Sequence, residues 1–242
     1  MGSSRFPGKP LAKLLGEPMI GHVYKRVAQN NMLSLTAVAT CDHEIKNYIE
    51  SIGGRAVMTN ERHERASDRC AEALAILERQ DNKRFEIVVM VQGDEPMTHP
   101  EMITEAVHPM LDDPEIQVVN LMGKIKSMEE FEDRNCIKVV CDLNGNALYF
   151  SREPIPTQSK IREASLHKQV CVIPFRRDFL IDYTNMEPTP LEIVESIDML
   201  RILENGLNVR MIPTKFQSYS VDTIEDLKKV SELMKESGTE RF

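Results

Sequence analysis

Short apolar runs alternate with amphipathic stretches along the first half of the chain. The run at 87–91 is almost continuously apolar, as expected for a strand that is covered on both faces of a sheet. The amphipathic stretches repeat with the helical period, for example at Met19, Ile20, Val23 and Val27. This alternation predicts a doubly wound α/β fold with a mostly parallel sheet. Strands are predicted at 35–40, 55–58 and 87–91, and helices at 18–30, 42–52 and 100–111.

Polar residues and glycines mark the ends of these helices. Asp42 precedes an amphipathic stretch and is a favoured N-cap residue, and the glycine pair at 53–54 ends the same helix. A further helix contains Leu74 and Leu77 among its apolar positions, and Ser67 or Asp68 is expected to cap it.

The second half has a different pattern, in which strands predominate before two final helices. Asn144-Gly145 lies between two apolar runs and is typical of a hairpin turn. With no repeat and no long linker, residues 1–242 are expected to form a single domain, in which a smaller mixed β segment covers about 117–185. Strands are predicted at 117–122, 136–142, 147–151, 169–175 and 209–214, and helices at 190–205 and 223–235.

Composition excludes several classes of function. The net charge of −8, with 28% charged residues, argues against broad nucleic-acid binding. Apolar stretches fall short of the roughly 20 residues of a membrane span, and the N-terminus lacks the apolar core of a signal peptide. The five cysteines form no CxxC pair, which indicates reduced thiols rather than a zinc site. We therefore expect a cytoplasmic protein without membrane insertion.

The first residues form a short basic loop that contains Ser3, Ser4, Arg5, Gly8 and Lys9. Backbone N–H groups and two cations in such a loop suit an oligophosphate. The loop differs from a Walker A motif, because five residues separate its glycines and a proline follows the lysine. A solvated, flexible basic N-terminus is the alternative interpretation.

Four further motifs follow this loop in order along the chain. They are QGDEP at 92–96, ALYFSR at 147–152, PTPLE at 188–192 and YSVDT at 219–223. Together with the N-terminal loop they cover nearly the whole chain. In this ordered combination the sequence resembles the sugar-activating cytidylyltransferases, and most closely the 3-deoxy-manno-octulosonate (Kdo) cytidylyltransferase family.

The resemblance implies a Rossmann-like nucleotidyltransferase that transfers CMP from CTP to a 3-deoxy-2-ulosonic acid, with Kdo as the expected acceptor. The anomeric hydroxyl of the sugar would attack the α-phosphorus and pyrophosphate would leave. The product would be an activated sugar for a lipopolysaccharide or another surface polysaccharide. Relatives are commonly dimeric through the second-half β segment, so the resemblance implies a homodimer and a β segment that contributes to the sugar pocket.

The resemblance also assigns catalytic residues. Asp94 and Asp222 would hold Mg²⁺, which usually takes one or two carboxylates together with phosphate oxygens. Asp94 lies just after a predicted strand, where α/β sheets bind ligands, and Asp222 has a similar setting. Arg5 and Lys9 would contact the phosphates and the leaving pyrophosphate. The alternatives are a turn residue for Asp94 and a helix N-cap for Asp222.

The remaining assignments concern the nucleotide and the sugar. Arg65 and Ala66 stand where relatives have serine and glycine, next to the segment expected near the base. Gln169 and Ile173 stand where Kdo-specific relatives have histidine and tyrosine, which leaves the identity of the sugar open. Nucleotide-binding residues are expected to be Ser3, Ser4, Gly8, Ser67 and Gln92. Sugar-binding residues are expected to be Arg152, Gln169, Glu192 and Glu195.

Two alternatives to the Kdo enzyme stay open. One keeps the chemistry on another acidic sugar, such as an amino-substituted Kdo or a nonulosonic acid. The other is a non-catalytic, truncated binding form, because relatives carry an apolar strand and an Ala-Arg pair before the glycine-serine loop. On that comparison we expect Met1 to be an internal methionine of a longer natural chain, or a misassigned start. A dinucleotide-dependent oxidoreductase is remote, since the chain lacks a GxGxxG motif.

Overall fold

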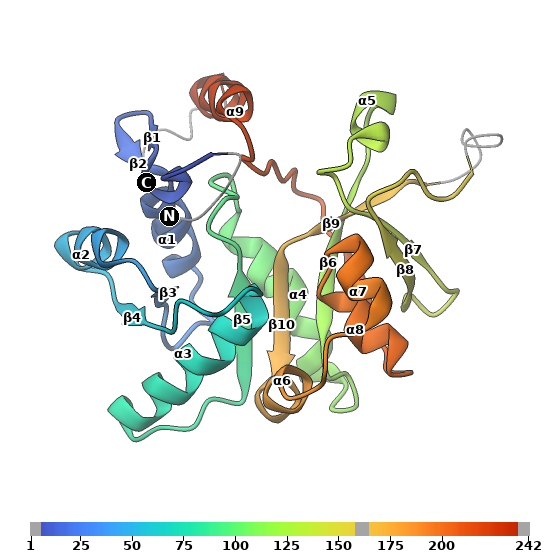
Figure 1. Cartoon of the computed structure of the whole chain (residues 1–242), viewed down its shortest axis with the longest axis horizontal. Coiled ribbons are helices and arrows are strands. Elements are labelled where there is room, and N and C mark those ends of the chain that lie inside the picture. Colours follow the sequence, from blue (N-terminus) through green and yellow to red (C-terminus); the bar gives the residue numbers. More distant parts are fainter. Residues whose placement is uncertain (1–5, 158–164, 237–242) are drawn as a thin grey trace. The chain divides into compact units, whose positions relative to one another are not determined.

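The computed structural model describes residues 6–157 and 165–236. The chain divides into two compact units, whose elements are labelled in Figure 1. The first unit comprises residues 1–83, 92–104 and 217–242, and the second comprises residues 84–91 and 105–216. The first unit is therefore assembled from three separate stretches of sequence, and each unit is considered by itself below.

A parallel pair of short strands organises the first unit. β3 (Val38–Thr40) pairs with β4 (Ala56–Met58), and helix α2 (His43–Ser51) connects the two strands along the chain. Both α2 and α3 (Ala66–Asp81) pack against these strands (Figure 1). This β–α–β arrangement confirms the alternation predicted from the apolar pattern, although β3 is shorter than the predicted strand at 35–40.

The predicted cap of α2 is confirmed, whereas the predicted cap of α3 is wrong. Asp42 Oδ1 accepts a hydrogen bond of 3.0 Å from the backbone N–H of Glu44, at the start of α2. In α3 the residue with extended backbone angles is Arg65, so the helix begins at Ala66. Ser67 and Asp68 consequently lie within its first turn rather than before it.

Two apolar clusters stabilise the first unit. One combines Ile20 of α1 (Met19–Ala28) with Ile45 and Ile49 of α2. The other brings together residues from both ends of the chain, since α9 (Ile224–Glu236) packs against the start of α1. Its buried members are Leu14, Met19, Val221, Val230 and Met234. The unit also contains η1 (Lys9–Leu11), β1 (Lys13–Leu14), β2 (Glu17–Pro18) and the first residues of α4 (Pro100–Asp112).

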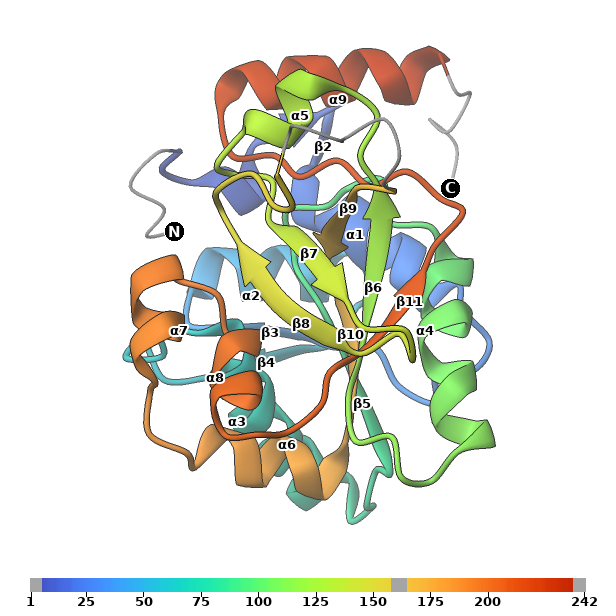
Figure 2. The same ribbon diagram turned by 90° about the vertical axis from the view of Figure 1, so that its right-hand side faces the viewer.

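A five-stranded mixed sheet forms the centre of the second unit, with the order β11-β6-β9-β7-β8 (Figure 2). β11 pairs with β6 in parallel, and the other pairs in this sheet are antiparallel. A second pair joins β5 and β10, which are antiparallel. The strands are β5 (Ile87–Val91), β6 (Val119–Lys124), β7 (Lys138–Cys141), β8 (Ala147–Ser151), β9 (His167–Val170), β10 (Val172–Arg176) and β11 (Arg210–Pro213).

The second unit confirms the predicted hairpin and corrects one predicted strand. β7 and β8 are joined by the turn that contains Gly145, whose φ of 79° lies in the left-handed region that glycine adopts readily. The single strand predicted at 169–175 is wrong, because the chain leaves β9 after Val170 and enters β10 at Val172. The two strands pair with different neighbours, so the apolar run is divided between two sheets.

The helix predicted at 190–205 is also divided. α7 (Pro190–Glu195) ends where Ser196 has a φ of 54°, and α8 (Met199–Glu204) follows. Two further helices, α5 (Met128–Glu132) and α6 (Arg177–Thr184), were not predicted from the sequence. Within residues 6–157 and 165–236, the helices are too short or too polar to cross a lipid bilayer.

Candidate active site

The N-terminal loop places Lys9 on a short turn of helix. Gly8 precedes η1 with a φ of 74°, a left-handed conformation that favours glycine. Its carbonyl oxygen accepts a hydrogen bond of 2.9 Å from Leu11 N, and Lys9 N donates to Phe6 O at 3.2 Å. Gly8 therefore shapes the turn as expected, while its contact with a nucleotide stays a prediction. Ser3, Ser4 and Arg5 lie outside the described residues.

The loop that carries Asp94 is fixed from several directions within the first unit. A Cβ atom added to Gly93 would lie 2.7 Å from Ile20 Cδ1, so a larger residue would require the end of the Ile20 side chain to move. Glu95 is buried and accepts a hydrogen bond from the hydroxyl of Ser218. Thr98 Oγ1 donates to Glu95 O at 2.8 Å. These contacts hold the carboxylate of Asp94 on a well-defined turn directly after β5 in the sequence.

Asp222 reaches the same place from the C-terminal stretch of the unit. The backbone N–H of Val221 donates a hydrogen bond of 2.9 Å to Asp94 O. The expected strand-end setting of Asp222 is wrong, because residues 217–222 form an irregular segment before α9. A backbone hydrogen bond, rather than a strand ladder, thus joins the stretches that carry the two aspartates.

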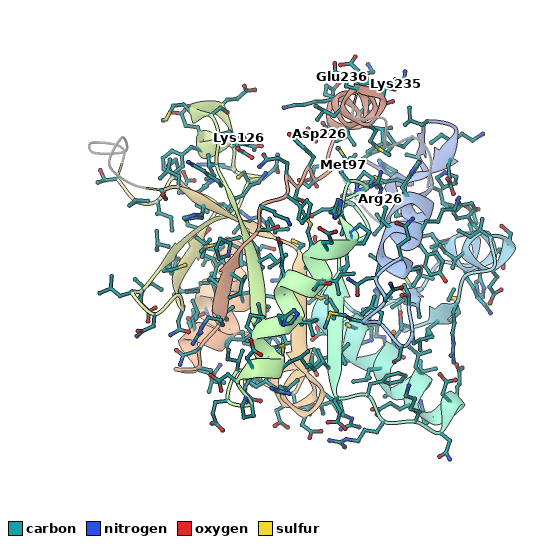
Figure 3. The ribbon with its side chains drawn as sticks, turned by 180° about the vertical axis from the view of Figure 1, so that it is seen from behind. Arg26, Met97, Lys126, Asp226, Lys235 and Glu236 are labelled. Atoms are coloured by element: carbon teal, nitrogen blue, oxygen red, sulfur yellow. The ribbon has the colours of Figure 1, made fainter. Side chains whose placement is uncertain are left out.

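The helix-capping interpretation of Asp222 is not what the structure shows. Thr223 Oγ1 accepts from Asp226 N at 3.1 Å, and Asp226 Oδ2 accepts from Thr223 N at 2.8 Å. These reciprocal bonds are those of a capping box, with Asp226 in the first turn of α9 (Figure 3). Since Thr223 and Asp226 cap the helix, the Asp222 side chain does not act as its N-cap.

Asp222 and Asp94 instead form ion pairs with the same lysine, Lys9. Lys9 Nζ lies 2.8 Å from Asp94 Oδ2 and 3.4 Å from Asp222 Oδ1. The side chain of Lys9 is 12% exposed, and those of Asp94 and Asp222 are 23% and 21% exposed. Three of the predicted catalytic residues are therefore brought together, from three stretches of the chain, around one positive charge.

The two carboxylates suit a divalent cation as well as an ammonium group. Hard oxygen ligands are what Mg²⁺ prefers, and it commonly binds one or two carboxylates plus waters and substrate phosphates. Among the described residues, no cluster of three or more His, Cys, Asp or Glu side chains could hold a metal ion by itself. A cation between Asp94 and Asp222 would therefore draw its remaining ligands from water or from a bound phosphate.

A second polar network surrounds the start of α3, in the region that the family resemblance predicts to lie near the base. The guanidinium of Arg69 donates to Thr59 Oγ1 at 2.6 Å and to His63 O at 3.3 Å. The carboxylate of Glu72 contacts the ring of His63 and accepts a hydrogen bond from the backbone N–H of Asn60. That backbone hydrogen bond, together with His63, lowers the pKa of Glu72.

The two nucleotide-binding candidates beyond the N-terminal loop have different surroundings. Ser67 is fully buried in the first turn of α3, and Gln92 is half-buried directly after β5. Burial leaves the Ser67 hydroxyl little access to a ligand. Contact of either side chain with a nucleotide stays a prediction.

In the second unit, Arg152 and Glu195 hold each other and the surrounding backbone. Arg152 Nε donates to Glu195 O at 2.7 Å, and Arg152 Nη2 donates to Ser196 O at 3.2 Å. The carboxylate of Glu195 accepts from Ser151 Oγ at 2.9 Å and from Arg152 N at 2.8 Å. These bonds tie the end of β8 to the break between α7 and α8. Sugar binding by Arg152 and Glu195 stays a prediction.

Glu192 has a structural partner in this unit. Its carboxylate receives two hydrogen bonds of 2.7 Å from the guanidinium of Arg201, which sequence reasoning missed. The side chains of Glu192 and Arg201 are 0% and 3% exposed. The carboxylate of Glu192 faces α8, and sugar binding by Glu192 stays a prediction.

Gln169 is oriented by a buried neighbour. Its Nε2 donates to Asn120 Oδ1 at 2.6 Å, and Asn120 Nδ2 donates to Val170 O at 2.8 Å. Nearby, the buried Lys138 donates to the carbonyl oxygens of Asp133 and Arg152, and burial lowers its pKa. Neither Asn120 nor Lys138 carries a sequence signal, because both lie in strands that read as apolar.

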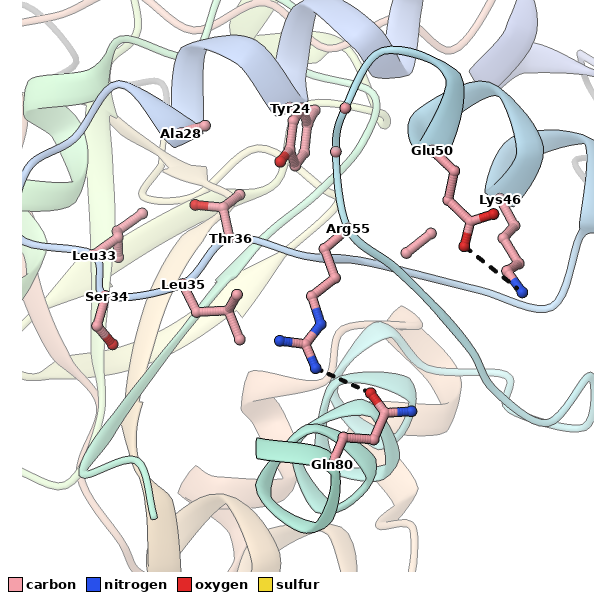
Figure 4. Close-up of a pocket in the computed structure, with 13 residues that line it drawn as sticks. Tyr24, Ala28, Leu33, Ser34, Leu35, Thr36, Lys46, Glu50, Arg55 and Gln80 are labelled. Atoms are coloured by element: carbon pink, nitrogen blue, oxygen red, sulfur yellow. Dashed lines mark hydrogen bonds and ion pairs between the residues drawn. The ribbon is translucent and has the colours of Figure 1, made fainter. Parts of the chain in front are cut away.

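A cavity of about 650 Å³ also opens in the first unit (Figure 4). It lies beside Thr36 and Arg55, which precede β3 and β4, and so at the amino ends of the parallel strands. Its charged groups are paired within the protein, Arg55 with Asp81 at 2.7 Å and Lys46 with Glu50 at 3.7 Å. The lining residues differ from the predicted site residues, so the cavity does not account for them.

Comparison with known proteins identifies the family of this chain. A family model described as "Cytidylyltransferase" matches residues 1–216. The 3-deoxy-manno-octulosonate cytidylyltransferase of Geobacter metallireducens is 42% identical over 241 residues, covering 95% of this chain and 92% of the relative. The enzyme of the same name from Syntrophus aciditrophicus is 42% identical over 233 residues, covering 96% and 93%.

Solved structures give the same result for the fold. A structure of CMP:2-keto-3-deoxy-manno-octonic acid synthetase complexed with CTP has a TM-score of 0.85 and 35% identity, covering 98% of this chain and 95% of that chain. A 4-diphosphocytidyl-2C-methyl-D-erythritol synthase from Anaerococcus prevotii has a TM-score of 0.62 with 11% identity over 93% of each chain, a likeness of fold alone. The predicted α/β nucleotidyltransferase fold is confirmed by these similarities.

Proposed function

Because this chain belongs to the cytidylyltransferase family, we propose that it transfers CMP from CTP to the anomeric hydroxyl of Kdo and releases pyrophosphate. The names of its relatives support this choice of substrates, and the similarity to them covers 95% or more of this chain. The observation that carries the proposal is the cluster of Lys9, Asp94 and Asp222. It combines two carboxylates and an ammonium group, which a triphosphate and its metal ion need together.

In the proposed reaction, the C2 hydroxyl oxygen of the sugar attacks the α-phosphorus of CTP. A new oxygen–phosphorus bond forms as the bond to the bridging oxygen of the β-phosphate breaks, and the hydroxyl proton passes to solvent. Asp94 and Asp222 would hold Mg²⁺, whose bound form neutralises phosphate charge and favours ionisation of the hydroxyl. Lys9, with Arg5, would stabilise the negative charge that develops on the leaving pyrophosphate.

For the sugar acid, Gln169 is the candidate that the structure supports best. It is half-buried, and the hydrogen bond with Asn120 fixes the orientation of its amide. An amide at this position can donate to a carboxylate or accept from a hydroxyl. Arg152, Glu192 and Glu195 would act on the pocket through the framework that they hold together.

The proposal includes a homodimer formed through the second unit. β8 and α7, which Glu195 and Ser151 join, expose Leu148 (62%), Ile193 (60%) and Val194 (81%). Apolar side chains gathered on one unit are typical of an interface between subunits. Light scattering on the wild type and on Val194→Asp would test this, with a shift toward the monomer expected for the variant.

We place the reaction in the cytoplasm, where nucleoside triphosphates are made. The structure shows Cys41, Cys70, Cys136, Cys141 and Cys171 as free thiols, a state that a reducing compartment preserves.

The decisive experiment measures pyrophosphate release with CTP, Mg²⁺ and Kdo. UTP and ATP replace CTP in parallel reactions, and other ulosonic acids replace Kdo. Release with CTP and Kdo alone supports the proposal in full. Release only with CTP and a different acid would retain the chemistry and contradict Kdo, in agreement with the Gln169 and Ile173 departures. Absence of release with every pair would contradict catalysis.

A further inference from the structure

One ammonium group lies between the two carboxylates to which the proposed function assigns Mg²⁺. Lys9 Nζ contacts Asp94 Oδ2 at 2.8 Å and Asp222 Oδ1 at 3.4 Å, both ordinary ion-pair distances. The lysine side chain is the most buried of the three. Lys9 thus neutralises the same oxygen atoms that a divalent cation would need as ligands.

The backbone around Lys9 is held firmly, so any change of partner has to come from its side chain. Leu11 N donates to Gly8 O at 2.9 Å, and Ala12 N donates to Lys9 O at 3.1 Å. Met19 N in turn donates to Ala12 O at 2.9 Å, which anchors the turn to α1. The lysine stem is flexible and ends in a point charge that accepts any nearby anion. Its ammonium group can therefore change partners while the loop keeps its shape.

Charge repulsion disfavours the binding of an ammonium group and a divalent cation to the same carboxylate pair at such short range. A bound triphosphate supplies a competing set of anionic oxygens, to which Lys9 is already expected to bind. We propose that Lys9 gates the metal site: it holds Asp94 and Asp222 in the substrate-free enzyme and transfers to the triphosphate when CTP binds. The proposal rests on the proposed function, because it takes CTP as the source of the phosphates.

Transfer of Lys9 makes the binding of metal and nucleotide mutually dependent. Nucleotide removes the competing cation from the carboxylates, so it favours the metal, and by linkage the metal favours the nucleotide to the same extent. Without nucleotide, Lys9 keeps the metal affinity low. The gate thereby discourages the site from filling with a divalent cation before the substrate is present.

The first test titrates nucleotide-free protein with Mn²⁺ alone, followed by calorimetry and by the electron paramagnetic resonance signal of free Mn²⁺. Lys9→Met should bind Mn²⁺ about tenfold more tightly than the wild type, because the competing charge is gone. Lys13→Met removes an exposed lysine of the neighbouring strand and should match the wild type. Unchanged or weaker Mn²⁺ binding in Lys9→Met would overturn the proposal.

Two further variants guard against a change of fold or of binding site. Lys9→Gln should reproduce the result of Lys9→Met, and thermal melting of both should show a larger rise with Mn²⁺ than the wild type shows. Asp94→Asn combined with Lys9→Met should lose the tight binding. If the tight binding persists in this double variant, the ion lies elsewhere and the gate is wrong.

The transfer itself is tested by titrating CTP into the protein in EDTA and in Mg²⁺. The dissociation constant of CTP in EDTA, divided by that in Mg²⁺, should be smaller in Lys9→Met than in the wild type. An equal ratio in the two proteins would overturn the transfer. Pyrophosphate release is measured on the same wild-type sample. Turnover together with unchanged Mn²⁺ affinity in Lys9→Met would overturn the gate and leave the function intact. Tighter Mn²⁺ binding in Lys9→Met without wild-type turnover would support the gate as a metal lock and contradict the function.

Discussion

Carboxylates of the first unit and carboxylates of the second unit have different surroundings, although all were predicted as ligand-binding residues. Asp94 and Asp222 share one lysine and keep about a fifth of their surface exposed. Glu192 is fully buried against Arg201, with both carboxylate oxygens engaged. An ion pair with one flexible lysine can be exchanged for a ligand, whereas a bidentate buried pair with arginine cannot be exchanged without loss of stability.

A motif match alone does not distinguish a ligand-binding carboxylate from a structural one. The PTPLE motif and the QGDEP motif support the family resemblance equally well. The partner of each carboxylate makes the distinction. Asp94 meets a lysine from a loop, and Glu192 meets an arginine from the next helix.

The largest expected effect is on catalysis in the first unit. Asp94→Asn and Asp222→Asn should each lower kcat by about a hundred- to thousandfold, because a neutral amide stabilises neither the metal ion nor the charge in the transition state. Pyrophosphate release measures the effect, and circular dichroism checks the fold. Asp112→Asn, at the exposed end of α4, is the matched control. Full activity in either active-site variant would contradict a catalytic role for that aspartate.

The next effect is on stability in the second unit. Arg201→Met leaves the Glu192 carboxylate buried without its counter-charge, which should cost about 3–5 kcal/mol of unfolding free energy. Urea denaturation monitored by circular dichroism gives the value. The double variant Glu192→Leu with Arg201→Met should recover most of the loss. If that stable double variant instead has a raised KM for the sugar, Glu192 is a sugar-binding residue.

Glu195 is intermediate between the aspartates that share Lys9 and the buried Glu192. Glu195→Gln keeps the size of the side chain but weakens the hydrogen bonds from Ser151 and Arg152, so we expect a loss of about 1–3 kcal/mol. Burial, followed by the charge of Glu195, raises the pKa of Tyr149, so the substitution should move the Tyr149 titration to lower pH. Ultraviolet absorbance follows that titration. If only KM for the sugar changes, Glu195 is a ligand-binding residue.

The smallest effect concerns acid stability around α7. Burial works to raise the pKa of Glu204, but the Thr189 side chain and hydrogen bonds from the backbone N–H groups of Leu191 and Glu192 outweigh it and lower that pKa. A carboxylate with a lowered pKa stabilises the fold above its unfolded pKa and loses this contribution as pH falls. Wild type should therefore lose stability between pH 5 and roughly pH 3 more steeply than Glu204→Gln. Identical acid unfolding curves would contradict this.

Much of the fold could be predicted because local signals agree with it. Asp42 before α2, Gly53 after it and Gly145 in the β7–β8 turn each mark a boundary that the structure confirms. The break between α7 and α8 escaped prediction because Ser196, not a glycine, takes the left-handed conformation. The division of the strand at 169–175 escaped it because the chain changes sheets at Cys171 without a glycine or proline.

The candidate site could be predicted in part, for a different reason. Lys9, Asp94 and Asp222 belong to motifs whose order along the chain carried the resemblance, and the structure brings them together. Arg201, Asn120 and Lys138 could not be found this way, since they lie outside these motifs and are recognised only by their hydrogen bonds in the folded chain. A buried polar residue in an apolar pattern has no distinguishing local signal.

The backbone hydrogen bond from Val221 to Asp94 joins the C-terminal stretch of the first unit to its middle stretch. The second carboxylate and three of the five buried residues of the α9 cluster come from the final stretch of the chain. A nascent polypeptide that has been synthesised only as far as residue 216 already contains every other predicted site residue, yet it has no Asp222 to share Lys9. Lys9 and Asp94 can therefore meet Asp222 only after the residues that follow residue 216 have been synthesised.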